Sequence, residues 1–245
     1  MINFRKFKKP KFLTMKKSFL ALQAAFVLFC SAVSAQVHPK EAYADIKAWN
    51  KVLDAKHKSY DPNNLKEITV SEVIDKNGAD LNIEFIIHAP FEDVSNYYYQ
   101  YQTMSFIHKG YIMTVRKPGS TDFYGSGSFR TNTLSGFSYS EIVDENSANG
   151  NKYHVESPMV ETQKGSYQVM DLGNGSTKVK FSMQLKFKAP FTGFKAMYKF
   201  INAANIESMY TTKSLLEEDS KFYTRITWLD ELIKKKGWPT PPPMK

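Results

Sequence analysis

The residues that could carry acid–base or metal chemistry are few and widely spaced in this sequence. The five histidines are His38, His57, His88, His108 and His154, and no two of them have the spacing of a helical zinc motif such as H-E-x-x-H. His88 and His154 fall on the polar side of strand-like patterns, which favours solvent exposure. The only cysteine, Cys30, lies in an apolar run near the N-terminus. We therefore expect no bound metal and no other cofactor.

Motifs for a catalytic nucleophile or a phosphate loop are also missing. The sequence has no G-x-S-x-G, and 125-GSGSF-129 is followed neither by a Lys-Ser/Thr pair nor by a helical pattern. Four charged residues on strand-like segments could face either way: Arg116, Arg130, Glu141 and Glu156. An inward Arg116 or Arg130 would be a polar anchor for a ligand carboxylate or phosphate. The commoner alternative is a solvated arginine on the outer face.

The basic charge of the chain is concentrated at its N-terminus. Of the 33 lysines and arginines, seven precede Ala35, in a stretch that contains no acidic residue. The rest of the chain therefore carries 26 basic residues against 24 acidic ones. A nearly neutral body lacks the basic surface on which nucleic-acid binding depends, so we expect no nucleic-acid partner.

Residues 15–35 read as a secretory signal, with two lysines, an apolar run, and the small residues Val33 and Ala35 before Gln36. We predict cleavage near Ala35-Gln36, export to the periplasm or the medium, and no membrane span afterwards. The alternative is a retained N-terminal anchor. Met15 opens a complete signal by itself, so residues 1–14 would be an upstream extension. The mature chain would contain no cysteine and hence no disulfide.

Periodicity divides the remaining chain into elements. Helical spacing at 36–64 predicts an N-terminal helical extension, and residues 65–236 form the predicted main domain. Strand-like alternation within that domain covers 67–74, 81–88, 110–116, 122–131, 136–144, 152–157, 165–172 and 177–188.

Helical patterns follow Pro90 and Pro190. The second of these regions is one helix or two, with Asn205 and the stretch 218–220 as the alternative break points. Residues 237–245 are a proline-rich tail.

The stretch 83-IEFIIHAPFEDVSNYY-98 resembles the opening of START-like domains, the group that includes polyketide cyclases/dehydrases and lipid-transport proteins. The stretch 173-GNGSTKVKFSMQLKF-187 resembles the last strand of that group. The resemblance implies an α+β helix-grip fold, in which a curved antiparallel β-sheet wraps around a long C-terminal helix. It also implies an apolar cavity between the sheet and the helix.

The cavity would bind a lipid or another hydrophobic small molecule without catalysis. The residues that we expect to line it are Tyr98, Tyr101, Met113, Phe129, Tyr139, Tyr167, Met183, Phe187, Phe194, Met197 and Ile201. Plain core packing is the alternative role for most of them.

Three other functions stay open beside this one. A cyclase or hydrolase of the same fold would need an inward pair of titratable side chains. A solid-cored interaction domain would have no ligand cavity. A lipocalin barrel is disfavoured because the region after Pro190 is helical. The sequence indicates neither the ligand nor the oligomeric state.

Overall fold

The structure is a computed structural model that describes residues 43–100, 111–116, 123–128 and 138–236. Its helices are α2 (Tyr43–His57), α3 (Phe91–Tyr99), α4 (Lys195–Glu218) and α5 (Thr227–Lys236), with short 3₁₀ turns η3 (Phe191–Gly193) and η4 (Phe222–Arg225). Its strands are β1 (Ile68–Ile74), β2 (Ala79–Ile87), β3 (Tyr111–Arg116), β4 (Phe123–Ser128), β5 (Ser138–Ser147), β6 (Gly150–Glu156), β7 (Val160–Asp171) and β8 (Thr177–Phe187).

The strands form one antiparallel sheet in the order β1-β2-β8-β7-β6-β5-β4-β3. Each strand-like segment of the sequence overlaps one of these strands. The short turn-rich connectors put β3 to β8 beside one another in chain order. The exception is β2, which pairs with β8 because the helical segment after Pro90 carries the chain away from it.

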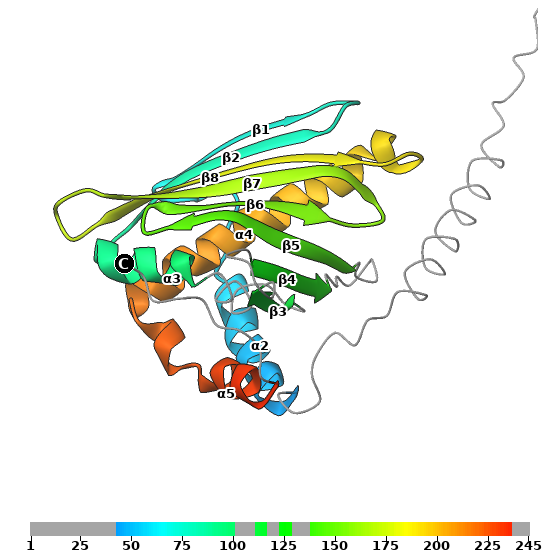
Figure 1. Ribbon diagram of the computed structural model, residues 1–245. Helices are drawn as coiled ribbons and strands as arrows, with labels where there is room; N and C mark the ends of the chain where they lie inside the picture. Colours follow the sequence, from blue (N-terminus) through cyan, green and yellow to red (C-terminus); the bar gives the residue numbers. More distant parts are fainter. Residues whose placement is uncertain (1–42, 101–110, 117–122, 129–137, 237–245) are drawn as a thin grey trace, which may run out of the picture.

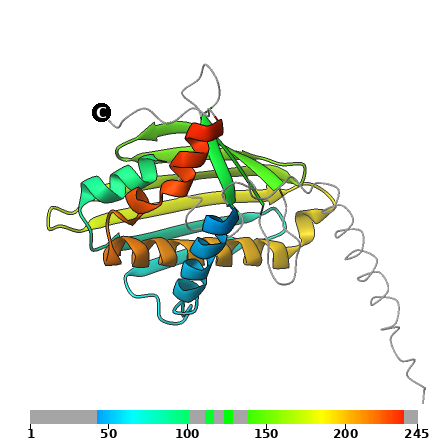
Figure 2. The same ribbon diagram turned by 90° about the horizontal axis from the view of Figure 1, so that it is seen from below.

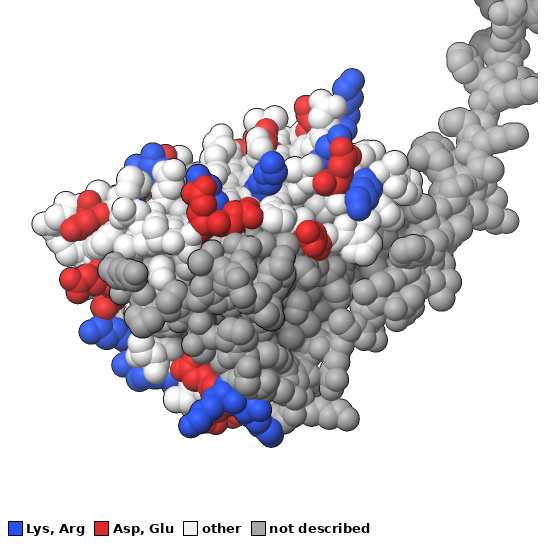
Figure 3. Space-filling view, viewed as in Figure 1, with Lys and Arg blue, Asp and Glu red and all other residues white. Residues whose placement is uncertain are grey.

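Strand β8 shows why the sheet has one buried and one wet face. Its alternating apolar residues, from Val179 to Phe187, are each at most 2% exposed. On the opposite face of the sheet, Lys178 and Lys180 pair with Glu84. Figure 3 shows acidic and basic side chains interspersed over the described surface in this view, as the nearly neutral composition predicts.

The strand-to-turn boundaries follow from local chemistry. At the β1–β2 hairpin, Gly78 has φ +156°, and a Cβ there would collide with the carbonyl oxygen of Leu185. The Asp75 carboxylate accepts the backbone N–H groups of Asn77 and Gly78, which closes this turn. Pro90 precedes the first residue of α3, because it lacks the N–H that a continuing strand would need.

The helices cover the buried face of the sheet. α4 packs on β1 and β2, and α3 packs on β6 and β7, so the two helices cover different parts of the sheet (Figures 1 and 2). The C-terminal region is two helices, and α4 ends at Glu218, which selects the second of the two break points. This arrangement confirms the predicted α+β helix-grip fold.

Helix α2 belongs to the same core. It packs against α4, and its Leu53 is fully buried (Figure 2). The boundary predicted at residue 64 therefore lies between elements that pack together.

The parts predicted as a signal (1–35) and a proline-rich tail (237–245) lie outside the described residues. None of the helices that the structure describes is long and apolar enough to span a bilayer.

Candidate functional site

The inner face of the sheet is apolar across the strands whose side chains are described. Cross-strand partners share a face, so the register places Leu81, Met183, Gly165, Tyr153 and Val143 in one row that runs from β2 to β5. The side chains in this row are almost completely buried. Among the described residues of β2, β6, β7 and β8, no charged side chain is buried. The face is suited to a hydrophobic partner.

A continuous series of aromatic rings links this face to the helices. Neighbouring ring centroids in the series lie between 4.9 and 6.1 Å apart. The rings make stacked, tilted and edge-to-face contacts, which are worth about 0.5–1.5 kcal/mol each. In order, from α2 through η4 and α3 to β7 and β8, the rings are Trp49, Phe222, Tyr97, Tyr98, Tyr167 and Phe181.

Tyr98 lies at the centre of this series and carries a buried hydroxyl. Its ring is 4.9 Å from that of Tyr167, and only 2% of the residue is exposed. The hydroxyl has no hydrogen-bond partner among the described residues. Burial, and then the neighbouring Tyr97, raise the pKa of Tyr98 well above 10.0, so this hydroxyl stays neutral.

Helix α3 is held on the sheet by two asparagines. Asn151 of β6 donates its amide to the carbonyl oxygen of Tyr98, and Asn146 of β5 donates to that of Tyr99. These bonds satisfy carbonyls near the end of the helix, which lack intrahelical partners. The side-chain oxygen of Asn151 is itself buried without a partner among the described residues.

The expected lining residues separate into two groups along β8. Tyr98 and Tyr167 meet at α3, whereas Phe187, Phe194, Met197 and Ile201 lie around the start of α4. In the second group the Phe187 ring contacts Tyr198, whose hydroxyl accepts the Phe187 backbone N–H.

Met183 lies between these two groups and is 1% exposed. Its sulfur accepts weak bonds from the amides of Gln163 and Asn205. It is therefore packed beneath the middle of α4.

Several expected site residues lie where the structure describes the backbone alone or does not describe the chain. Tyr101, Phe129 and Arg130 lie outside the described residues. The backbone register puts Arg116 in the row of Phe123 and Val143, Tyr139 beside Gly127, and Met113 in the row of Ser126, Ser140 and Glu156. Their roles as lining or anchor residues stay predictions.

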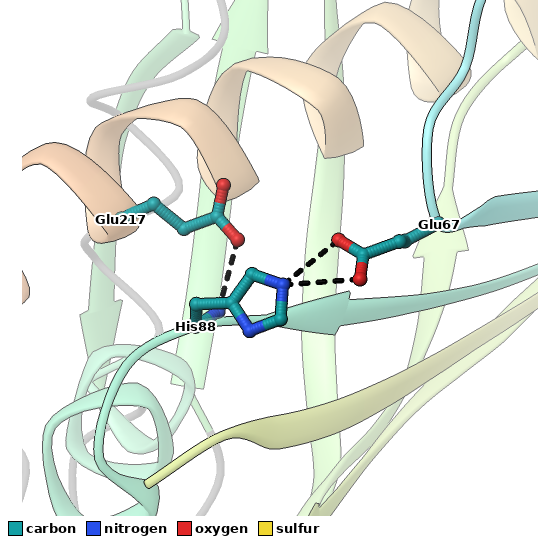
Figure 4. Close-up of side chains that lie close together, drawn as sticks. All are labelled: Glu67, His88 and Glu217. Atoms are coloured by element: carbon teal, nitrogen blue, oxygen red, sulfur yellow. Dashed lines mark hydrogen bonds and ion pairs between the residues drawn. The ribbon is translucent and has the colours of Figure 1, made fainter.

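A polar cluster lies at the other end of α4, at the surface. Figure 4 shows His88, just after β2, between Glu67, just before β1, and Glu217 of α4. The His88 ring Nε2 is 3.0 Å from both Glu67 carboxylate oxygens, and its Nδ1 is 3.1 Å from Ser176 Oγ. The His88 backbone N–H donates to Glu217 at 2.9 Å.

Lys213 of α4 provides the positive charge in this cluster. Its ammonium is 3.1 Å from Glu67 and 2.6 Å from Glu217, and it also donates to the carbonyl oxygen of Ile86. The hydrogen bond from Lys213 is the main cause of the lowered pKa of Glu67, with a smaller contribution from His88.

Two carboxylates and an imidazole are ligands that a divalent metal could use. The Lys213 ammonium already bonds to both carboxylates, so a metal ion would have to displace it. The cluster therefore works as an ion-pair clamp that joins α4 to the sheet.

Several residues of the aromatic series and of the polar cluster were not predicted from the sequence. Tyr97 and Phe181 were not singled out, although each falls on the apolar side of its element. Glu67 and Lys213 are far apart in the sequence, and no local signal indicates that they meet. The positive φ of Glu67, at 56°, is likewise invisible in a single sequence.

No family model and no curated protein matches this chain. Similar solved structures include an aromatase/cyclase, Zhui, from Streptomyces sp. R1128, at 11% identity and TM-score 0.48, covering 60% of this chain and 95% of that one. A protein of Thermus thermophilus has 14% identity and TM-score 0.47, and the match covers 55% of this chain and 94% of that one. A START superfamily protein from Mycobacterium smegmatis has 11% identity and TM-score 0.43, covering 62% and 98%.

The fold assignment therefore depends on the topology rather than on these similarities. In the one antiparallel sheet, β1 and β3 are the outermost strands and β8 lies between β2 and β7. A 24-residue helix that follows β8 packs across β1 and β2. This is the arrangement that the two stretches around Ala89-Pro90 and Gly173–Phe187 predicted. The chain has the α+β helix-grip fold.

Proposed function

We propose that this protein is exported and holds a lipid or another hydrophobic small molecule between the inner face of the sheet and its helices. The observation that carries the proposal is the uncharged, aromatic inner face around Tyr98, Tyr167 and Phe181. Binding would remove apolar ligand surface from water, which contributes about 25 cal/mol per Å². No bond in the ligand is made or broken.

The position of the buried charge favours binding over catalysis. Lys213 is the one charged side chain that is buried among the described residues, and it meets its carboxylates at the surface cluster rather than on the inner face. An enzyme of the same fold would need an acid or base directed at its substrate. Among the described side chains of β2, β6, β7 and β8, the buried acid–base groups on the inner face are the hydroxyls of Tyr153 and Tyr167.

The test is to purify the exported protein from its own cells and record its mass under native and denaturing conditions. Organic extraction then identifies whatever dissociates on unfolding. We expect a hydrophobic compound at close to one per chain, and rebinding of N-phenyl-1-naphthylamine by the extracted, refolded protein. Refolded protein that binds neither the extract nor this fluorophore would refute the proposal.

Export is tested separately by N-terminal sequencing of the same preparation. We expect the mature chain to begin at or near Gln36. A chain that begins at Met1 or Met15 would refute the cleavage.

A further inference from the structure

We propose that the Tyr98 hydroxyl hydrogen-bonds a neutral oxygen of the ligand, so that the ligand is amphipathic and uncharged at that end, such as an alcohol, ketone or ester. This inference rests on the proposed function and names the chemical class of its ligand. It starts from one atom, the phenolic oxygen of Tyr98, which is buried without a hydrogen-bond partner among the described residues.

Leaving such a hydroxyl buried and unpaired is unfavourable. Burial without a partner costs about 1–3 kcal/mol, which is why buried polar atoms in folded proteins nearly always have partners. Phenylalanine would fill the same space and make the same ring contacts with Tyr97 and Tyr167. A hydroxyl at this position is therefore best explained by a partner that arrives with the ligand.

The surroundings of the hydroxyl favour a neutral partner. The causes that raise the pKa of Tyr98 are burial and the neighbouring Tyr97, and neither supplies positive charge. Among the described side chains of α3, β6, β7 and β8, no cation is buried, so these elements offer a buried carboxylate or phosphate no ion-pair partner, which is strongly unfavourable.

Asn151 supports the same conclusion. It bonds the backbone of Tyr98, and its own side-chain oxygen is a second buried acceptor without a partner among the described residues. A buried amide oxygen on β6 repels an anion but accepts a hydrogen bond from an alcohol, so it too favours a neutral ligand.

The position of Tyr98 also suits an anchoring role. The residue lies on α3, and its ring contacts the inner face of β7 at Tyr167. The series of rings continues to Phe181, so apolar surface extends from the hydroxyl along the sheet. A ligand that bonds Tyr98 with its polar end could place its apolar part against that surface.

The test compares Tyr98→Phe with the wild-type protein, using displacement of N-phenyl-1-naphthylamine by decane, 1-decanol and decanoate. We expect the variant to bind 1-decanol roughly 2- to 12-fold more weakly, the range that one net hydrogen bond gives. Decane binding should not change. The wild-type protein should bind 1-decanol more tightly than decanoate.

Tyr210→Phe is the matched control, because the Tyr210 hydroxyl donates to the carbonyl oxygen of Ser59 at 3.0 Å. It should leave the affinities for all three compounds unchanged. Ligand-free stability gives an independent measurement: Tyr98→Phe should not lower the urea midpoint, since its hydroxyl has no partner to lose among the described residues.

The outcomes separate the two proposals. If the wild-type protein does not bind the fluorophore, the proposed function is wrong. If the wild-type protein binds all three compounds, two results would refute the role of the hydroxyl. Tyr98→Phe would either lower the affinities for 1-decanol and decane equally or leave both unchanged. A lower urea midpoint for ligand-free Tyr98→Phe would refute it too, and tighter binding of decanoate than of 1-decanol would refute the neutral ligand end.

Discussion

Replacing Leu53 with alanine tests whether α2 is an integral part of the fold. Leu53 is fully buried, and the helix that carries it packs against α4. One turn earlier, Trp49 stacks on Phe222, which in turn contacts Tyr97. Through these contacts α2 supports the helix that presents Tyr98. The loss of Leu53 should therefore weaken the whole domain rather than loosen an appendage.

The expected magnitude follows from the burial of the side chain. Truncating a completely buried leucine removes its transfer free energy and leaves a cavity, which together cost about 2–5 kcal/mol. For a domain of this size, each kcal/mol lowers Tm by roughly 2–4 °C. We therefore expect Leu53→Ala to lower Tm by roughly 4–20 °C, in a single transition.

Thermal and urea unfolding followed by circular dichroism measure this effect, with Val52→Ala as the matched control. Val52 is the adjacent residue on the same helix and is 41% exposed, so its truncation should change stability by less than about 0.5 kcal/mol. Equal, small effects of the two substitutions would show that α2 does not share the core. A separate early transition in Leu53→Ala would mean that α2 unfolds on its own.

Two further predictions follow from other parts of the structure. Lys213 holds the pKa of Glu67 below its ordinary 4.5, so the stabilisation from Glu67 is complete above pH 4.5 and is lost as the pH falls through the lowered pKa. Glu67→Gln should therefore make the free energy of unfolding depend less steeply on pH in the acidic range. An unchanged pH dependence in that range would contradict the ion-pair clamp. Gly165→Ala should destabilise the protein and shift the near-ultraviolet tyrosine signal, because a Cβ at 165 overlaps the Tyr153 ring; a variant as stable as wild type with the same spectrum would show that the ring does not lie there.

The strands were predictable because their chemistry is local. The two-residue alternation of β8 places Val179 and Phe187 on one face and lysines on the other, whatever the rest of the chain does. Asp75 and Gly78 define the β1–β2 turn within four residues. Pro90 then separates strand from helix, because its ring fixes φ and leaves it without a backbone N–H.

The pairing of distant residues was not predictable in this way. Nothing near Glu67 in the sequence indicates that it meets Lys213, since the contact exists only once α4 lies along β1 and β2. The expected lining set combined Tyr98 with Phe187 because both are apolar and inward, but their packing partners are Tyr167 and Tyr198 respectively. Periodicity identifies the buried face of an element without showing what lies opposite.

Photolabelling with an apolar diazirine probe tests the central claim most directly, because it maps where a hydrophobic ligand lies. After irradiation and digestion, we predict labelled peptides from α3 and from the inner-face strands β6 to β8, including Tyr98, Tyr167 or Phe181, with labelling suppressed by the natural extract. Labelling confined to exposed residues such as Val73 and Leu172, or unaffected by the extract, would contradict an internal site.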